Sequence, residues 1–404
     1  MAIDINRFAK ERFSPFFLFD ELPFLDNTER FLAAFQSVYP SYRLAYSFKT
    51  NYTPYICELV KNKGLYAEVV SDMEYALARK IGFTNQMIIY NGPYKGPLLE
   101  DHLLGGGIVN IDNLNECRRI GAFAASHPDH QFKIGLRLNL DLGAGFISRF
   151  GMAEDSEDIR CCVELVKSRQ NLQIVGMHCH IKAPRDPDSW ERRAKIMIAA
   201  ADKYIEGVPE YISLGSGMFP GEYSQYAEDF DSFKPSYGDF AKAIFLPFKE
   251  HYPANNWPIV FTEPGRSLIS RYIRFFAKVD SIKEVRGRIL ATTNGSVQNL
   301  GEIVSQARVP VIVHHNSAGE FFDKIDIMGY TCLEQDIMFS SFQGELAVGD
   351  WLEFRNVGGY SVVFKPQFAY PQCPMYAMHG NGEAEEIMRK ESFDDIFSRF
   401  IFEN

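Results

Sequence analysis

Long apolar runs are absent from this 404-residue sequence. No stretch reaches the roughly 18 consecutive apolar residues that a membrane-spanning helix needs, so we expect no membrane span. The N-terminal stretch MAIDINRFAKERF carries charges throughout and has no apolar core, so it does not resemble a signal peptide. We therefore expect a cytoplasmic protein.

Positive charge is also in short supply. The 42 Lys and Arg residues face 52 Asp and Glu residues, for a net charge of -10, which argues against DNA, RNA or an anionic membrane as a general partner. The seven cysteines are odd in number and scattered, which predicts reduced thiols and no disulfide framework. The adjacent Cys161 and Cys162 are expected to fill core or surface. No internal repeat and no low-complexity block is present.

Aromatic residues, by contrast, are abundant. The sequence holds 34 Phe and 20 Tyr, which suits a thick core and an aromatic pocket or subunit interface. A chain of 404 residues exceeds the usual size of a single hydrophobic core. The length therefore predicts two domains.

Short strand-like runs alternate with amphipathic helical stretches between residues 28 and 267. Helices are expected at 72–81 and 114–125, for example. This alternation predicts parallel βαβ units, and eight strands over about 240 residues suit an α/β fold of the (β/α)₈ TIM-like barrel type. An open, doubly wound sheet is the alternative. The expected strands are 43–48, 66–69, 87–90, 108–111, 133–138, 174–178, 211–214 and 259–263.

The sequence pattern changes after Gly265, where strand-like runs follow one another with Gly or Pro between them. This pattern predicts a β-rich second domain. The stretch 12–20 also has strand character, so we expect that domain to be discontinuous, built from 1–27 and 268–404. Its expected strands are 271–279, 289–293, 310–314, 351–354 and 360–364.

Lys49, in the segment YSFKTN, is the most informative single residue. A lysine at the end of an inward-facing strand loses hydration, which lowers its pKa and exposes a nucleophilic amine. Such an amine can hold an aldehyde cofactor as a Schiff base. An ordinary exposed lysine closing a strand is the alternative for this segment alone.

The ends of the other expected barrel strands are also rich in polar groups. Barrel active sites lie at that end, so several such groups would meet there. Glycines in Gly215-Ser216-Gly217 and at Gly265 let backbone N–H groups approach an anion, and Arg266 adds a bidentate charge. These loops follow the seventh and eighth strands, which predicts a phosphate site. Other strand-end groups are Glu68, Glu74, Asn91, Asp112, Glu116, Arg137 and Asn139.

A metal site is a competing interpretation of the histidines. His178 and His180 share one face of a strand, and His314-His315 lie further along the chain. The spacing matches no common zinc framework, so we expect no metal.

An ordered series of motifs runs through residues 46–360, nearly the whole chain. The motifs are YSFKTN (46–51), SRFGM (148–152), HCH (178–180), LGSGMFP (214–220), EPGR (263–266), GYTCLEQD (329–336) and GGY (358–360). In this series the chain resembles the fold-type III pyridoxal-phosphate decarboxylases, the relatives of diaminopimelate, ornithine and carboxynorspermidine decarboxylases. The resemblance implies an alanine racemase-like two-domain architecture.

The resemblance implies catalytic roles for four residues. Lys49 would hold the cofactor pyridoxal 5′-phosphate and return a proton to the decarboxylated carbon. His180 would stack on the pyridine ring, and Glu263 would pair with the ring nitrogen. Cys332 would reach the active site of a neighbouring subunit and share the proton delivery, so a homodimer with shared sites is implied.

The resemblance also implies a set of phosphate contacts and a reaction type. A carboxylate at Glu263 keeps the ring nitrogen protonated and the ring a strong electron sink, whereas the family's racemases place arginine there. Decarboxylation is therefore favoured over racemisation, and a non-catalytic binding protein is a third possibility that the retained motifs oppose. The implied phosphate contacts are Gly215, Ser216, Gly217, Gly265, Arg266 and Tyr360.

Two departures from the family pattern bear on the substrate, an α-amino acid. Lys182 stands where relatives have glycine, and it would meet an anionic part of the substrate or remain solvated. Leu333 stands where the ornithine and diaminopimelate enzymes have an acidic residue that reads the distal amine, and an apolar side chain cannot replace that bond. Glu334 or Asp336 would compensate from another angle. We therefore expect a diamino acid or, in preference to the free diamino acids, one substituted on its distal amine, as in polyamine, siderophore or antibiotic pathways.

Overall fold

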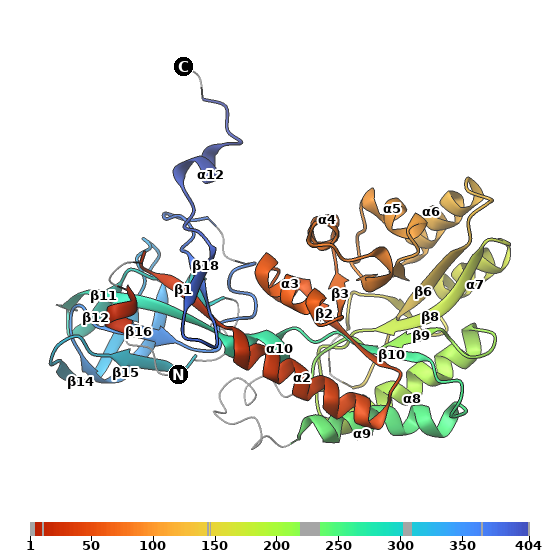
Figure 1. Cartoon of the computed structure of the whole chain (residues 1–404), viewed down its shortest axis with the longest axis horizontal. Helices are drawn as coiled ribbons and strands as arrows, with labels where there is room; N and C mark the ends of the chain where they lie inside the picture. Colours follow the sequence, from red (N-terminus) through yellow and green to blue (C-terminus); the bar gives the residue numbers. More distant parts are fainter. Residues whose placement is uncertain are drawn as a thin grey trace. The chain divides into compact units, whose positions relative to one another are not determined.

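The structure is a computed structural model. It describes residues 5–402 apart from 10, 11, 144, 146, 219–234, 302–308, 365 and 366. The chain divides into two compact units (Figure 1). One is Thr28–Ser267, and the other combines Met1–Asn27 with Leu268–Asn404.

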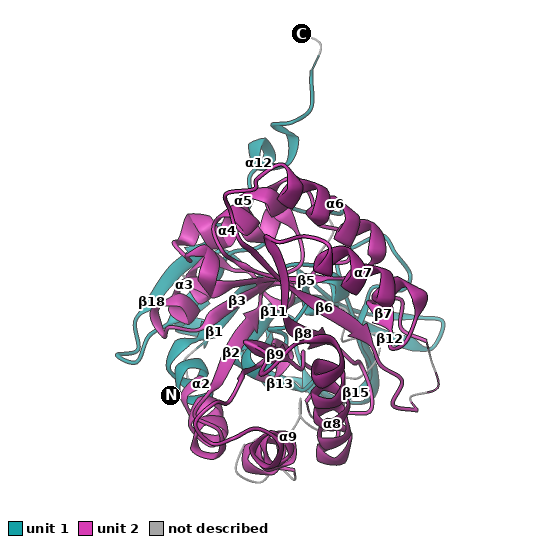
Figure 2. Ribbon diagram, turned by 90° about the vertical axis from the view of Figure 1, so that its right-hand side faces the viewer, with its two compact units in different colours: residues 1–27, 268–404 teal, residues 28–267 magenta. Residues whose placement is uncertain are grey.

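The strands of the first unit close into a barrel, shown in Figure 2. Eight parallel strands in the described residues each pair with the next along the chain, and the last pairs back with the first. The predicted (β/α)₈ barrel is confirmed, and the doubly wound sheet is excluded because an open sheet would leave two edges unpaired. The strands are β2 (Tyr42–Ser47), β3 (Tyr66–Val69), β4 (Ile88–Tyr90), β5 (Ile108–Ile111), β6 (Phe132–Asn139), β8 (Leu172–Cys179), β9 (Tyr211–Ser213) and β10 (Ile259–Thr262).

Helices surround the strands of this unit in Figure 2. Several begin at a polar side chain that accepts a hydrogen bond from the first turn, as Ser71 does from the N–H of Glu74. The helices expected at 72–81 and 114–125 are α4 and α6. The helices are α2 (Glu21–Val38), α3 (Pro54–Asn62), α4 (Asp72–Ile81), α5 (Leu98–Leu104), α6 (Leu114–Ala125), α7 (Glu157–Lys167), α8 (Pro187–Tyr204) and α9 (Tyr237–His251). The shorter elements are η1 (Phe48–Thr50), η2 (Asn85–Met87) and β7 (Met152–Ala153).

Tyr211 fills part of the barrel interior. Its ring lies where a side chain on Gly135 or Gly176 would have to go: an added Cβ would stand 2.2 Å from the Tyr211 side chain in each case. Its hydroxyl donates to Asn110 Oδ1 at 2.8 Å, so the buried polar group is satisfied. Glycine at these two strand positions therefore makes room for a large side chain across the barrel.

The second unit is built on a β-sheet. The first strand of the chain pairs antiparallel with β11 and parallel with β17, so the N-terminal segment belongs to this sheet. An aromatic cluster that includes Phe16, Phe276 and Trp351 packs against it. The strands are β1 (Phe16–Asp20), β11 (Ile273–Val285), β12 (Arg288–Thr293), β13 (Val311–His314), β14 (Glu320–Met328), β15 (Ile337–Leu346), β16 (Trp351–Phe354), β17 (Met375–Met378) and β18 (Ala384–Met388). The helices are α1 (Ile5–Ala9), α10 (Arg266–Ile269), η4 (Ser270–Tyr272), α11 (Val297–Leu300) and α12 (Phe393–Phe397).

One expected strand of this sheet is wrong. Residues 360–364 form turns, because Tyr360 takes a left-handed conformation (φ 61°) that breaks an extended run. The strands β14, β15, β17 and β18 were not expected from the sequence, since charged and small residues interrupt their apolar patterns. Within the described residues, no helix has both the length and the apolar composition that a membrane span requires.

Candidate active site

Lys49 lies just beyond the end of β2, in the short helix η1. Its Nζ is 2.6 Å from Glu68 Oε2, and its side chain keeps 30% of its exposure while that of Glu68 keeps 1%. Ser47 Oγ donates to the same carboxylate oxygen at 2.6 Å. A buried carboxylate thus holds a partly accessible amine at this end of the barrel.

Glu263 follows β10 and is buried with 1% exposure. Its carboxylate accepts hydrogen bonds from Ser213 Oγ at 2.7 Å and Asn91 Nδ2 at 2.9 Å, and His178 Nε2 lies 3.2 Å away. Burial alone would raise the pKa of Glu263, but the charge and hydrogen bond of His178, the charge of Lys49 and the Ser213 bond together lower it below its usual value. This carboxylate therefore stays ionised at neutral pH.

Asn91 joins the two carboxylates. Its Nδ2 also lies 3.3 Å from Glu68 Oε1, and its Oδ1 accepts a 2.7 Å bond from Asn110. The oriented amide fixes the distance between the acid beside Lys49 and the acid at Glu263. Ser213 and the bridging role of Asn91 escaped the sequence analysis; a buried polar residue inside an apolar strand was the available signal for Ser213.

His180 follows β8 and is half-buried. Its Nδ1 accepts a hydrogen bond from the N–H of Ser216 at 3.3 Å. Burial and the nearby positive charge of Lys49 lower the pKa of His180 well below its usual value. The ring is therefore a neutral imidazole at neutral pH.

The loop Gly215-Ser216-Gly217 packs tightly on the segment after β8. Gly215 and Gly217 have φ of +67° and +98°, and a Cβ on them would stand 2.5 Å from the carbonyl oxygen of Cys179 and 2.8 Å from that of Ile181. The N–H of Glu263 donates to the carbonyl of Gly215 at 2.7 Å, which ties this loop to the end of β10. Only glycine fits these two positions, so the backbone itself forms the surface here.

Gly265 and Arg266 lie at the end of the same strand β10. An added Cβ on Gly265 would meet Thr50 Oγ1 at 2.0 Å, so this backbone packs directly beside the segment that carries Lys49. Arg266 is half-buried at the start of α10. The barrel therefore brings Lys49, His180, the glycine loop, Glu263 and Arg266 to one end, since each follows the carboxyl end of a parallel strand.

Two buried ion pairs brace the neighbouring strand ends. Arg137 Nη1 lies 2.9 Å from Asp112 Oδ1, and Lys95 Nζ lies 2.7 Å from Glu116 Oε1. Lys95 also donates to the carbonyls of Gly92 and Asn110 at 2.8 and 2.9 Å, so its buried ammonium group has three polar neighbours. These charges are structural supports of the barrel mouth.

Glu74 gives a testable pH dependence beside this site. Its carboxylate accepts a 2.8 Å bond from the N–H of Val70. The pKa of Glu74 is raised to about 7. Burial is the main cause and the charge of Glu68 adds to the rise, whereas the Val70 hydrogen bond and the charge of Lys49 oppose it. Because the folded pKa lies above the unfolded value of about 4.3, the stability that protonation contributes is present below that pH and is lost as the pH rises through 7. We expect Glu74→Gln to raise the midpoint of thermal unfolding by about 5 °C at pH 8 and by a clearly smaller amount at pH 5, where only part of this stability has been lost. An equal shift at both pH values would contradict this assignment.

The predicted residues of the second unit lie on one turn and one bend. Cys332, Leu333 and Glu334 are all exposed on the turn between β14 and β15, with Leu333 40% exposed. Tyr360 lies in the bend that follows β16 and is half-buried. Lys182, in the first unit, is exposed two residues after His180, and its carbonyl accepts a 2.7 Å bond from Arg185 Nε.

Asp336 accepts hydrogen bonds in and beside the turn that carries Cys332. It is buried with 2% exposure. Its carboxylate accepts bonds from the N–H of Val297 at 2.8 Å, the hydroxyl of Ser296 at 3.1 Å and the N–H of Thr331 at 3.0 Å. Its oxygens therefore help to shape the turn, and a contact with substrate stays a prediction.

The histidines that suggested a metal have other partners. His178 pairs with Glu263, and His314 Nε2 lies 2.7 Å from Glu353 Oε2 in the other unit. No group of three or more metal-ligating side chains is found in the part of the chain that the structure describes. Cys162 is buried in the core and Cys161 is half-buried.

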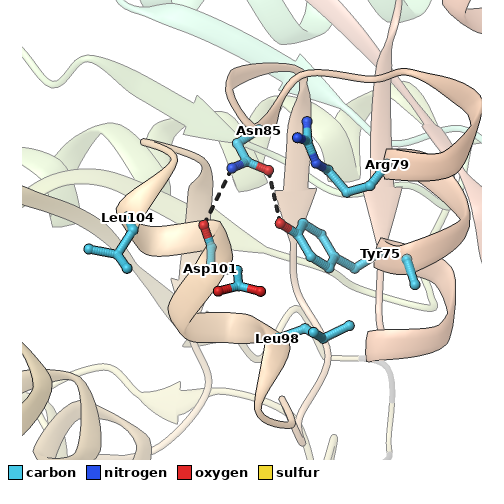
Figure 3. A pocket seen from close by; sticks show the side chains of 7 residues that line it. Tyr75, Arg79, Asn85, Leu98, Asp101 and Leu104 are labelled. Atoms are coloured by element: carbon cyan, nitrogen blue, oxygen red, sulfur yellow. Dashed lines mark hydrogen bonds between the residues drawn. The ribbon is translucent and has the colours of Figure 1, made fainter.

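A groove of about 520 Å³ lies outside this site, between α4 and α5. Figure 3 shows Tyr75 and Arg79 on one side and Leu98 and Leu104 on the other, with Asn85 hydrogen-bonded to Tyr75 and to the backbone of Asp101. It shares no residue with the barrel end described above.

The comparison with known families decides the family of this chain. Residues 25–270 match the family described as "Pyridoxal-dependent decarboxylase, pyridoxal binding domain". The chain belongs to this family. Its cofactor is pyridoxal 5′-phosphate, and its reaction is the decarboxylation of an amino acid. The racemase and binding-protein alternatives are therefore disfavoured.

Relatives extend over nearly the whole chain. Diaminopimelate decarboxylase from Methanothermobacter thermautotrophicus is 24% identical and covers 97% of this chain and 93% of its own length. The L-glutamyl-[BtrI acyl-carrier protein] decarboxylase of Niallia circulans is also 24% identical, covering 97% of this chain and 95% of its own. Among solved structures, diaminopimelate decarboxylase from M. jannaschii matches with a TM-score of 0.86 at 20% identity, covering 98% of this chain and 94% of that one. This structural likeness supports the fold.

Proposed function

We propose that the decarboxylation takes place at the barrel end around Lys49, with the side-chain roles that the family motifs imply. Bound pyridoxal 5′-phosphate would supply an aldehyde for the amine and a cationic ring that accepts electrons from the breaking bond to the carboxylate. The side chains fit such a group, because an amine, a neutral imidazole, a buried carboxylate and a glycine loop meet there. Lys49 would hold the aldehyde and His180 would lie on the ring face.

Glu263 carries the proposal. A buried, ionised carboxylate held by Ser213, Asn91 and His178 is well placed to keep a pyridine nitrogen protonated, through opposite-charge stabilisation. The two acids joined by Asn91 have different tasks: Glu68 would hold the amine of Lys49, and Glu263 would hold the ring. Arginine at position 263 would oppose protonation of the ring nitrogen, whereas glutamate favours it.

The phosphate would lie at the glycine loop. Backbone N–H groups at positive-φ glycines and the guanidinium of Arg266 are suitable partners for a dianion. Tyr360 would add a hydroxyl. The contacts proposed are Gly215, Ser216, Gly217, Gly265, Arg266 and Tyr360.

The exposed turn at Cys332 supports a shared-site homodimer. Its thiol would enter the site of a second copy and, with Lys49, deliver the proton that replaces the lost carboxylate. We expect Lys49→Ala and Cys332→Ala each to impair activity as pure proteins. Mixed and allowed to exchange subunits, they should recover about a quarter of wild-type activity, because half of the dimers would be mixed and would hold one complete site each. No recovery on mixing, with exchange verified by differently tagged copies, would rule out shared sites.

The substrate proposed is an α-amino acid substituted on its distal amine. Leu333 offers no charge to a free ammonium group, and Asp336 is occupied by the turn, which leaves Glu334 as the acidic residue exposed beside it. One relative is itself named for a glutamyl group on an acyl-carrier protein, so a substrate other than a free amino acid has a precedent. Lys182 would meet an anionic part of such a substrate.

A CO₂-release screen tests this function and its substrate class together. We expect turnover of amino acids substituted on the distal amine to exceed that of free ornithine, lysine or diaminopimelate by at least about tenfold. Leu333→Asp should move the preference toward the free diamino acids, with Val348→Asp, another exposed apolar site in the same unit, as the matched control. Efficient turnover of free ornithine or lysine would overturn the substrate class. Exchange of the α-hydrogen without CO₂ release would instead favour a racemase.

A further inference from the structure

Two buried side chains of α8 donate hydrogen bonds to the backbone of the glycine loop. Arg193 Nη1 donates to the carbonyls of Leu214 at 2.9 Å and Ser216 at 3.1 Å. Trp190 Nε1 donates to the carbonyl of Gly217 at 3.4 Å, and the Arg193 guanidinium lies 4.0 Å from the centre of the Trp190 ring. Both side chains are fully buried. One stacked pair therefore holds three carbonyls of the segment 214–217.

These bonds fix the direction of the loop N–H groups. In a planar trans peptide, the carbonyl of one residue and the N–H of the next point in opposite directions. Because Arg193 holds the carbonyls of Leu214 and Ser216, the N–H groups of Gly215 and Gly217 point away from α8. Neither N–H donates a hydrogen bond to any group among the described residues. Arg193 therefore orients the backbone N–H groups of Gly215 and Gly217 so that both point away from α8, on the opposite side of the loop.

The charge of Arg193 has no acidic partner in the described part of the chain. Its Nε and Nη2 atoms are buried and make no hydrogen bond there. Burial lowers the pKa of Arg193 to about 10, and no carboxylate is among the groups that influence it. The guanidinium nevertheless stays charged at neutral pH. A buried, uncompensated cation favours binding of an anion nearby, because the anion supplies the opposite charge that the protein lacks.

We propose that Arg193 is a positioning residue and a buried counter-charge for the cofactor phosphate, acting through the peptide units of the glycine loop. This inference rests on the proposed phosphate position. Arg266 would face the phosphate directly, while Arg193 would act from the far side of the loop without touching it. Trp190 would keep the guanidinium in place.

The test compares two ligands that differ only in the phosphate. Dissociation constants of pyridoxal 5′-phosphate and of unphosphorylated pyridoxal are measured on the full chain freed of cofactor, and their ratio is taken as the phosphate preference. Arg193→Met should reduce this preference by about 10–100-fold, since charged hydrogen-bonding groups contribute that much. Pyridoxal affinity should change less than about threefold. Arg193→Lys, which keeps the charge, should recover at least about half of the loss on a logarithmic scale.

Arg192→Met is the matched control, because Arg192 is the adjacent residue on α8 and is exposed. It should leave the preference unchanged. A folded Arg193→Met protein with a wild-type preference, an equal loss for both ligands, or a lysine variant no better than the methionine variant would each overturn the proposal. If Arg193→Met does not fold, Trp190→Phe replaces it: its preference should fall about threefold, and an unchanged preference counts against the proposal. Failure of the wild-type protein to prefer the phosphorylated ligand would instead refute the phosphate site itself.

Discussion

Lys49→Ala is expected to abolish decarboxylation, lowering kcat/KM by roughly a thousandfold or more. The amine at this position is the group proposed to hold the cofactor aldehyde and to return a proton. The variant should also lose the visible absorption of cofactor bound through an amine and should not become labelled on borohydride reduction. Steady-state CO₂ release and the absorption spectrum measure the two effects.

Lys49→Arg separates the amine from the charge. A guanidinium can keep the ion pair with Glu68, but it stays protonated and cannot act as a nucleophile. We expect it to be as inactive as Lys49→Ala while unfolding at a temperature nearer the wild type. Lys80→Ala, on the exposed side of α4, is the control and should behave as wild type. An alanine variant that still carried a reducible cofactor would mean that another lysine holds it.

Glu263→Gln is expected to reduce kcat by roughly 100-fold or more. It removes a negative charge whose electrostatic interaction with the ring would be stronger in a buried site than in water. The amide has the same shape, so packing against Ser213 and His178 is largely kept. Without the negative charge, the protonated form of the cofactor's ring nitrogen would be less stable, and the ring would accept electrons less readily. Glu263→Asp, which keeps the charge at a shorter reach, should fall between the two.

Acid stability gives an independent readout of Glu263. Because its pKa is lowered on folding, the ionised carboxylate stabilises the folded state above the unfolded value of about 4.3, and this contribution is lost as the pH falls further. Stability of Glu263→Gln should therefore decline less steeply on acidification. Glu210→Gln, half-exposed beside β9, is the control for both measurements. A Glu263→Gln enzyme with near wild-type turnover would remove the carboxylate from the reaction.

Local sequence patterns were sufficient to predict the barrel, because each strand–helix–strand repeat is built from segments that are neighbours in sequence. The strands at 66–69 and 108–111 and the helices at 72–81 and 114–125 appear with the expected bounds, since alternating apolar runs and polar caps are short-range signals. The β-sheet of the second unit was harder. Charged residues interrupt the apolar alternation of β14, which becomes extended by pairing with β15 on one side and with β12, earlier in the chain, on the other, so its sequence pattern is weak.

The strand-end motifs determined the kind of chemistry in advance, because a parallel barrel brings every carboxyl-terminal strand end to one side whatever the details of packing. Which group touches which was decided only by the tertiary structure. The sequence did not show the bonds that Asp336 accepts within its turn, nor the link that Asn91 forms between Glu68 and Glu263, which are far apart in the chain. Arg193 carries no motif at all. Hydrogen bonds and buried charge depend on distances of a few ångströms between distant segments, and linear spacing does not encode those distances.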